Sequence, residues 1–252
     1  MIILHTPRFN KNDSAQTIVV CIHGFMGTPD FFKPLAAALF AQGFSVATLL
    51  LPGHGTTGRD FAHSKLAVWE DHVRCEVTRY AKEYKNVLLV GHSIGGLLAL
   101  NLSLLIPKVR AVAAISTPLK LYTLHPTGFI RKGRLMRQKD ETIRATYRAA
   151  NSVPLAFPHT LRFFQILNQP AKLVKKTRKN LKDITVPTLF IHSKKDETVM
   201  FKSSAMFDRG LANAPHKAVL LNDSYHVYYT PEERELFSNA IFDFFSPYRT
   251  RV

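Results

Sequence analysis

The chain has 252 residues, of which 46% are hydrophobic and 21% are charged. That length suits one large domain, or one domain with an insertion, and the composition is typical of an ordinary folded protein. No apolar run reaches the roughly 20 residues of a membrane-spanning helix, and the N-terminus turns polar too early for a secretory signal, so we expect a cytoplasmic protein without a transmembrane segment.

Short β-branched apolar runs alternate with longer amphipathic stretches, which is typical of a mostly parallel sheet flanked by helices. The expected strands are residues 17–22, 45–51, 86–90, 109–115, 188–192 and 217–221. The expected helices are residues 30–42, 68–84, 94–105, 199–211 and 231–245. Because the strands are apolar almost throughout, both faces of the sheet must be covered, which predicts an α/β fold with a doubly wound sheet.

The alternation breaks once, between residues 116 and 184, where the sequence has helical rather than strand character. An ordinary crossover needs only about a dozen residues. The length of this stretch therefore predicts a helical cap inserted over the edge of the sheet. We expect a core made of residues 1–116 and 184–252, and a helical, basic cap made of residues 117–183.

The net charge of +16 is concentrated in that cap. Residues 119–182 hold 15 Lys and Arg against two acidic residues, whereas the rest of the chain holds 19 against 16. No base-reading motif accompanies the basic residues, so a nucleic-acid partner is not expected. Two hypotheses stay open: attraction of an anionic substrate or anionic lipid surface, and a solvated basic face that only maintains solubility.

Residues 91–96 read GHSIGG and fit the pattern G-x-S-x-G. A predicted strand ends directly before this motif and a predicted helix begins directly after it. A serine at such a sharp turn projects its hydroxyl above the carboxyl edge of the sheet. The glycines leave room for a strained backbone, and the helix N-terminus favours developing negative charge. Ser93 is therefore the expected nucleophile.

A serine hydroxyl needs a base to take its proton, and the base needs a carboxylate to fix its tautomer. With this type of nucleophile, both partners follow the serine at the ends of later strands. His226 follows the predicted strand 217–221 and is the expected base. Asp196 follows the predicted strand 188–192 and is the expected acid. Asp223 is its rival, although an Asn-Asp-Ser sequence is more simply a turn.

The tetrahedral intermediate of such a reaction carries an oxyanion that needs two preorganised donors. One expected donor is the backbone N–H of Ile94, directly after the nucleophile. The other is the backbone N–H of Phe25, in the sequence HGFMG that follows the first predicted strand. Gly24 allows close approach there. Gly24 and His92 are also candidates for lining the substrate pocket.

Six short motifs stand in a recognisable order along the chain: HGFMGTP, LPGHG, WED, GHSIGG, KKDETV and SYHV. Together they resemble the bacterial carboxylesterase and monoacylglycerol lipase branch of the α/β hydrolases, over nearly the whole chain except the cap. The resemblance implies the α/β-hydrolase fold and hydrolysis of short-chain or monoacyl carboxylic esters through an acyl-enzyme. It also implies that Ser93, Asp196 and His226 act without metal or cofactor. Because the N-terminal part is short, the first antiparallel strands are expected to be missing or reduced to residues 2–5.

The cap decides the substrate. An apolar cluster in it either lines an acyl pocket, for which Phe163 and Phe164 are the candidates, or only packs the cap onto the core; its members are Leu155, Phe157, Leu161, Phe163, Phe164, Ile166 and Leu167. The main alternative enzyme is an acyl thioesterase, whose phosphate-bearing substrate would explain a basic rim. Outside enzymes, the alternatives are a nucleic-acid- or anion-binding protein that uses the basic segment, and a non-catalytic binding module that has kept the fold. The intact triad and oxyanion loop argue against the binding module.

Overall fold

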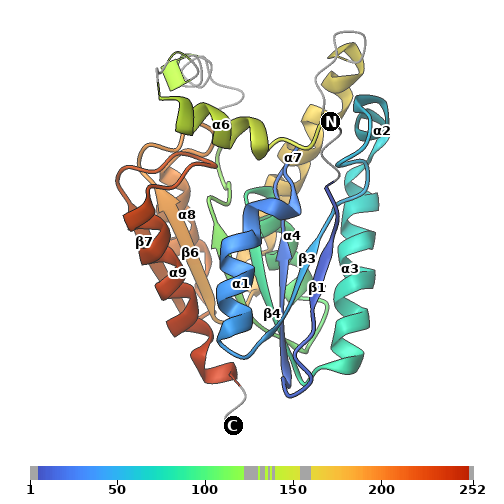
Figure 1. The fold of residues 1–252 in the computed structure, drawn as a ribbon, viewed down its shortest axis with the longest axis vertical. Coiled ribbons are helices and arrows are strands. Elements are labelled where there is room, and N and C mark those ends of the chain that lie inside the picture. Colours follow the sequence, from blue (N-terminus) through green and yellow to red (C-terminus); the bar gives the residue numbers. More distant parts are fainter. Residues whose placement is uncertain are drawn as a thin grey trace.

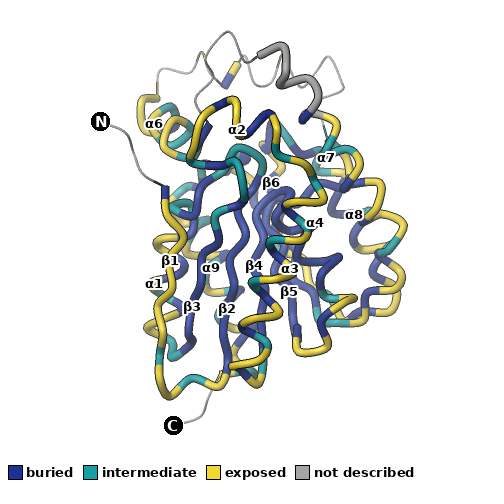
Figure 2. The backbone as a smooth tube through the Cα atoms, turned by 90° about the vertical axis from the view of Figure 1, so that its right-hand side faces the viewer, coloured by how far each residue is buried: buried dark blue, intermediate teal, exposed yellow. Residues whose placement is uncertain are grey.

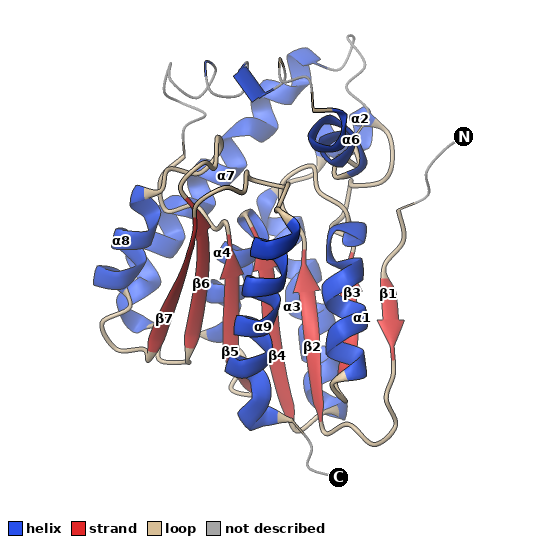
Figure 3. Ribbon diagram, turned by 60° about the vertical axis from the view of Figure 1, so that its left-hand side comes forward, coloured by secondary structure: helices blue, strands red, loops and turns tan. Residues whose placement is uncertain are grey.

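A seven-stranded sheet forms the centre of the molecule, in the order β1-β3-β2-β4-β5-β6-β7 (Figure 3). The computed structural model describes residues 5–121, 130, 134–135, 137, 140–153 and 160–249, with only the backbone of residues 160–165 and 167. Within these ranges β1 is antiparallel to β3 and the other strand pairs are parallel. The strands are β1 (Arg8–Asn10), β2 (Thr17–Ile22), β3 (Ser45–Leu49), β4 (Asn86–His92), β5 (Val109–Ile115), β6 (Thr188–Ser193) and β7 (His216–Leu221).

Helices cover both faces of this sheet. They are α1 (Lys33–Ala41), α2 (Gly58–His63), α3 (Leu66–Glu83), α4 (Ile94–Ser103), α6 (Glu141–Ala149), α7 (Thr160–Asn180), α8 (Lys202–Gly210) and α9 (Pro231–Phe245). Helices α1 and α9 cover one face, and α3, α4, α7 and α8 cover the other (Figure 1). Their buried side chains accordingly fall into two clusters, one on each face. The predicted α/β fold with a doubly wound sheet is therefore confirmed.

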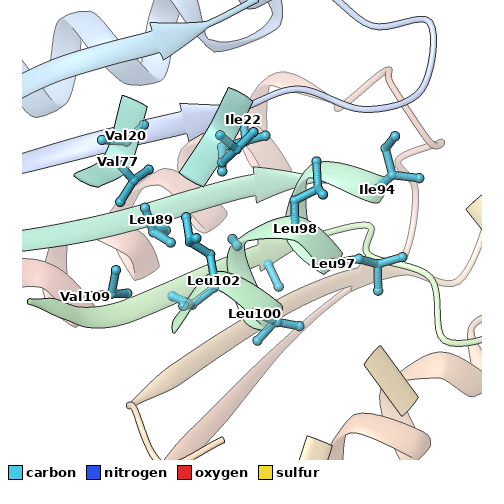
Figure 4. Packing of buried hydrophobic residues seen from close by; sticks show 14 of the residues in the cluster. Val20, Ile22, Val77, Leu89, Ile94, Leu97, Leu98, Leu100, Leu102 and Val109 are labelled. Atoms are coloured by element: carbon cyan, nitrogen blue, oxygen red, sulfur yellow. The ribbon is translucent and has the colours of Figure 1, made fainter. Parts of the chain in front are cut away.

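Buried aliphatic side chains hold these layers together. Every residue of β2 is buried, as continuous apolarity requires of a strand that is covered on both faces, and the central strands form the dark interior of Figure 2. Leu98 and Leu102 of α4 lie in one cluster with Val20 and Leu89 of the sheet (Figure 4). Full burial of each such side chain contributes roughly 1.5–3 kcal/mol.

The structure departs from the sequence-based expectations at two short elements. The antiparallel strand is β1 at Arg8–Asn10, so the expectation that it would be reduced to residues 2–5 is wrong; residues 1–4 lie outside the described part. All three residues of β1 are exposed, so no alternation of apolar and polar residues indicates a strand there. Helix α2 was also missed, although Thr57 and Asp60 form a capping box at its start, a signal that the sequence does carry.

The segment between β5 and β6 supplies α6 and α7. Helix α6 lies beyond the carboxyl ends of the strands (Figure 3), and Asp140 caps its N-terminus. The C-terminal half of α7 packs Leu173 and Val174 into the same cluster as α4. None of the helices in the described ranges is long and apolar enough to cross a membrane.

Candidate active site

Ser93 stands at the turn between β4 and α4 in a strained backbone conformation. Its φ of 53° and ψ of −122° lie where residues with a side chain are rarely found. Close packing enforces this turn: a Cβ atom on Gly95 would lie 2.0 Å from the carbonyl oxygen of Ile22, and one on Gly91 would lie 2.3 Å from the backbone nitrogen of Gly96. Only glycine fits at either position, and the serine is held at the tip of the turn.

His226 and Asp196 form a buried hydrogen-bonded pair. His226 Nδ1 lies 2.9 Å from Asp196 Oδ2, and Asp196 Oδ1 accepts the backbone N–H groups of Thr198 at 2.8 Å and Val199 at 2.7 Å. Although burial opposes the charged form, His226 and these two N–H groups hold the pKa of Asp196 below its ordinary value. The carboxylate therefore stays ionised and orients the imidazole. The rival, Asp223, is exposed and pairs with Lys195 at 2.7 Å instead.

Two further side chains hold the His226 loop in place. Glu197 is buried, and its Oε2 accepts the backbone N–H of His226 at 3.1 Å. His92 Nε2 donates to the carbonyl oxygen of His226 at 2.9 Å, and the two rings lie 4.9 Å apart. His92 directly precedes Ser93, so this bond ties the histidine loop to the serine turn. Glu197 was not predicted from the sequence, where the second acid of KKDETV was its only signal.

The loop after β2 lies against the serine turn. A Cβ atom on Gly24 would lie 2.9 Å from the Cβ of Ser93, so only glycine allows this approach. Met26 has a φ of 58°, and its N–H donates to His54 Nε2 at 3.2 Å. Ser152, which follows α6, donates its backbone N–H to the Met26 carbonyl at 2.9 Å. The loop that carries Phe25 is thus fixed from both the core and the segment after β5.

His54 fixes this loop as a neutral imidazole. Its Nε2 accepts a hydrogen bond while its Nδ1 donates to the Pro52 carbonyl at 3.3 Å. Burial lowers the pKa of His54 to about 4, because desolvation disfavours the charged ring. His23 has the same pattern: its Nε2 accepts the Leu51 N–H at 3.0 Å, and burial lowers its pKa well below the usual value. The LPGHG motif therefore supports the loop that carries Phe25.

The sequence pattern of a known family matches this geometry along the chain. The pattern described as "Alpha/beta hydrolase family" matches residues 19–240. This range includes the serine turn at Ser93, the acid loop that carries Asp196 and the histidine loop that carries His226. The chain belongs to the alpha/beta hydrolase family. The predicted family and fold class are therefore confirmed.

Relatives of this hydrolase include lipases. It is 26% identical over 228 residues to the thermostable monoacylglycerol lipase of Bacillus sp. (strain H-257), and the aligned region covers 90% of each chain. It resembles the solved structure of a soluble variant of monoglyceride lipase from Saccharomyces cerevisiae with a TM-score of 0.78 and 18% identity, over 97% of this chain and 92% of that one. It also resembles the solved structure of the Paleococcus ferrophilus monoacylglycerol lipase with a TM-score of 0.75 and 17% identity, over 96% of this chain and 98% of that one.

The structure brings most of the predicted site residues of this hydrolase together. Asp196 and His226 form a hydrogen-bonded pair, His92 bonds the His226 backbone, and Gly24 lies against Ser93. Ile94 begins α4 and Phe25 follows β2. The side chains of Phe163 and Phe164 lie outside the described part. Among the described residues, no three His, Cys, Asp or Glu side chains converge as a metal site.

The burial of His192 leads us to expect that the stability of this hydrolase depends on pH. It is buried in β6, its Nε2 has no hydrogen-bond partner among the described residues, and burial lowers its pKa to about 4. In the unfolded chain the pKa is near 6.5. Below that pH the unfolded state therefore binds a proton that the folded state rejects, and stability falls as pH falls toward 4. For this residue the free energy of unfolding should drop by roughly 2 kcal/mol between pH 7 and pH 5.

Denaturant unfolding at both pH values tests this expectation. In His192→Leu the drop in the free energy of unfolding between pH 7 and pH 5 should be smaller by roughly 2 kcal/mol. The matched control is His63→Leu, which replaces an exposed histidine of α2 and should keep the full drop. An unchanged drop in His192→Leu would show that another group controls the acid sensitivity.

Proposed function

We propose that this lipase- or esterase-type hydrolase cleaves short-chain or monoacyl carboxylic esters through an acyl-enzyme, with Ser93 as nucleophile, His226 as base and Asp196 as the orienting acid. The observation that carries the proposal is the fixed orientation of Asp196. Two backbone N–H groups hold one carboxylate oxygen, and the other faces His226 Nδ1 at 2.9 Å. His226 Nδ1 is thereby held as the protonated nitrogen, which leaves Nε2 free of its proton to act as the base.

The proposed reaction has two halves. His226 takes the proton of the Ser93 hydroxyl as the serine oxygen attacks the ester carbonyl, and then returns that proton to the departing alcohol. Water, activated by the same imidazole, then attacks the acyl-enzyme and releases the carboxylic acid. Asp196 stabilises the imidazolium that forms in both halves. Its lowered pKa supports this role, because the carboxylate must stay ionised at neutral pH.

We assign the oxyanion hole to the backbone N–H groups of Ile94 and Phe25. Donors that are fixed before the reaction stabilise developing charge without reorganising. The Phe25 ring packs edge-on against Phe61 and Trp69, with centroids 5.1 Å and 6.1 Å apart, and the next residue is anchored through His54. These contacts support a rigid donor at Phe25.

We further propose that residues 117–183 act as a cap over this site, with residues 1–116 and 184–252 as the core. The Tyr147 hydroxyl of α6 is buried beside Glu197, and burial together with that carboxylate raises the pKa of Tyr147 above its usual value. Helix α6 thus overlies the acid loop, which supports a role in enclosing the substrate. Phe163 and Phe164 remain the candidates for an acyl pocket, and a cytoplasmic location remains a prediction from the sequence.

An acyl thioesterase acting on an anionic acyl carrier is the second candidate, favoured by the basic charge of residues 119–182. Attraction between exposed charges is screened beyond about 8 Å at physiological ionic strength. If that charge attracts an anionic substrate or lipid surface, kcat/KM for an anionic substrate should fall steeply as salt rises, whereas a neutral ester should barely respond.

A substrate panel tests both candidates. We expect the pure protein to react with a fluorophosphonate and to hydrolyse p-nitrophenyl esters and monoacylglycerols of increasing chain length, with higher kcat/KM than for acyl-CoA of the same chain. Higher kcat/KM for acyl-CoA, with a steep salt dependence, would favour the thioesterase. Absence of both labelling and turnover would contradict the proposal.

A further inference from the structure

A groove of about 760 Å³ lies between α7 and the segment that follows β5. A volume of this size is within the range of ordinary ligand sites, roughly 300–1,000 Å³. None of the three proposed triad residues lines it.

One wall of the groove is a single face of α7. Its five residues are spaced three or four apart, which places them along the same side of a helix; they are Ala171, Val174, Lys175, Arg178 and Lys179. Val174 is buried and Ala171 half-buried, while the three basic residues are exposed. The helix therefore presents an apolar floor with a cationic rim.

The opposite wall, formed by residues 119–121 and Met200, is hydrogen-bonded to the segment that follows the acid loop. Leu121 forms a β-bridge with Val199, and the N–H of Met200 donates to the Lys120 carbonyl at 3.0 Å. Ser203 Oγ accepts the N–H groups of Leu119 at 3.2 Å and Lys120 at 3.0 Å. Because backbone hydrogen bonds fix this wall, the hollow is a formed feature of the fold.

The cations of the rim have no acidic partner among the residues that the structure describes. In the described part of the chain no acidic side chain pairs with Lys120, Lys175, Arg178 or Lys179, whereas Lys176, on another side of α7, pairs with Glu70 at 2.6 Å. The two acids of residues 119–182 are engaged elsewhere: Asp140 caps α6, and Glu141 pairs with Arg144 and Arg148. Four cations around one apolar floor repel one another unless an anion joins them.

We propose that this groove binds a single-chain anionic amphiphile, with the alkyl chain along Leu121, Val174 and Met200 and the anionic head among Lys175, Arg178 and Lys179. An apolar chain gains free energy in proportion to the area it buries on that floor. A carboxylate or phosphate head gains charge-assisted hydrogen bonds at the rim. A small inorganic anion would leave the floor exposed, and a neutral chain would leave the cations unpaired, so neither matches the whole groove.

The site lies beyond the proposed reaction and does not depend on it. Its wall nevertheless adjoins the acid loop, because Val199, the bridge partner of Leu121, donates its N–H to Asp196. Binding is therefore measured on Ser93→Ala protein, where turnover cannot interfere, and failure of either proposal is seen separately.

Isothermal titration calorimetry with four probes tests the site: decanoate, decyl phosphate, 1-decanol and acetate. We expect decanoate or decyl phosphate to bind at one site, and the tighter of the two identifies the preferred head group. Reversing two rim charges in Lys175→Glu/Arg178→Glu should weaken that binding about tenfold, because each reversal replaces an attraction between exposed charges with a repulsion. Ala171→Trp, which fills the floor without changing charge, should weaken it too.

The matched control is Lys172→Glu/Lys182→Glu, which makes the same change in net charge at exposed positions outside the groove lining. It should change Kd by less than about twofold, because separated exposed charges are screened. The proposal is overturned if neither anion binds, if both double variants weaken binding equally, or if 1-decanol or acetate binds as tightly as the tighter of the two anions. It is also overturned if the groove variants leave the binding of that anion unchanged, as binding near Ser93 would.

Discussion

Ser93→Ala should fold normally and lose turnover by about a millionfold, as removal of a triad serine does. Alanine keeps the Cβ that the turn already accommodates at a φ of 53°, so the strain of the turn stays the same and the melting temperature should barely change. What is lost is the only atom proposed to form the acyl-enzyme. Gel fluorescence after treatment with a fluorophosphonate and a rate assay with a short-chain ester measure the effect.

Ser116→Ala is the matched control for that variant. Ser116 is also a buried serine with positive φ, 45°, at the end of the neighbouring strand β5, and its hydroxyl lies 2.9 Å from the hydroxyl of Tyr229. Its replacement should cost about 1 kcal/mol of stability, the net contribution of one hydrogen bond, and leave labelling in place. Fluorophosphonate labelling of Ser93→Ala at the wild-type level would refute the assignment of the nucleophile.

Asp196→Asn should cut kcat by roughly four orders of magnitude while the protein stays folded. The two backbone N–H groups of Thr198 and Val199 require an oxygen at the Oδ1 position, so the new amide keeps its oxygen there. Its NH2 group must then face His226 Nδ1, which can no longer donate a proton to it. The imidazole takes the other tautomer, with its proton on Nε2, and ceases to be a base toward Ser93. Steady-state kinetics together with thermal unfolding separate this effect from loss of structure.

Asp223→Asn provides the comparison for the acid. It removes an exposed ion pair with Lys195, which contributes at most about 1 kcal/mol to stability. Its kcat should stay close to the wild-type value, because Asp223 does not contact His226 in the structure. The reverse order, with Asp223→Asn the inactive variant, would mean that the histidine loop takes another arrangement during turnover.

Local pattern was enough to predict the elements that carry the site. Strands β2 and β5 and helix α9 begin and end at the predicted residues, because continuous apolar runs and a Pro-Glu-Glu start are strong signals. Strand β1 and helix α2 gave weaker signals: an exposed three-residue edge strand has no apolar pattern, and a six-residue helix offers only its capping box. The chain order of Ser93, Asp196 and His226 made the candidate triad predictable as well.

The α/β architecture and the three side chains of the proposed triad could be predicted from the amino-acid sequence, because the carboxyl ends of parallel strands lie at one edge of the sheet wherever the intervening helices lie. The contacts that support these side chains depend on the tertiary structure. The bonds from Glu197 and His92 to the His226 backbone, and from His54 to Met26, join residues whose side-chain directions no local pattern specifies. The same holds for the cations of residues 119–182. Their number can be counted in the sequence. Four of them surround one apolar floor because α7 packs beside residues 119–121.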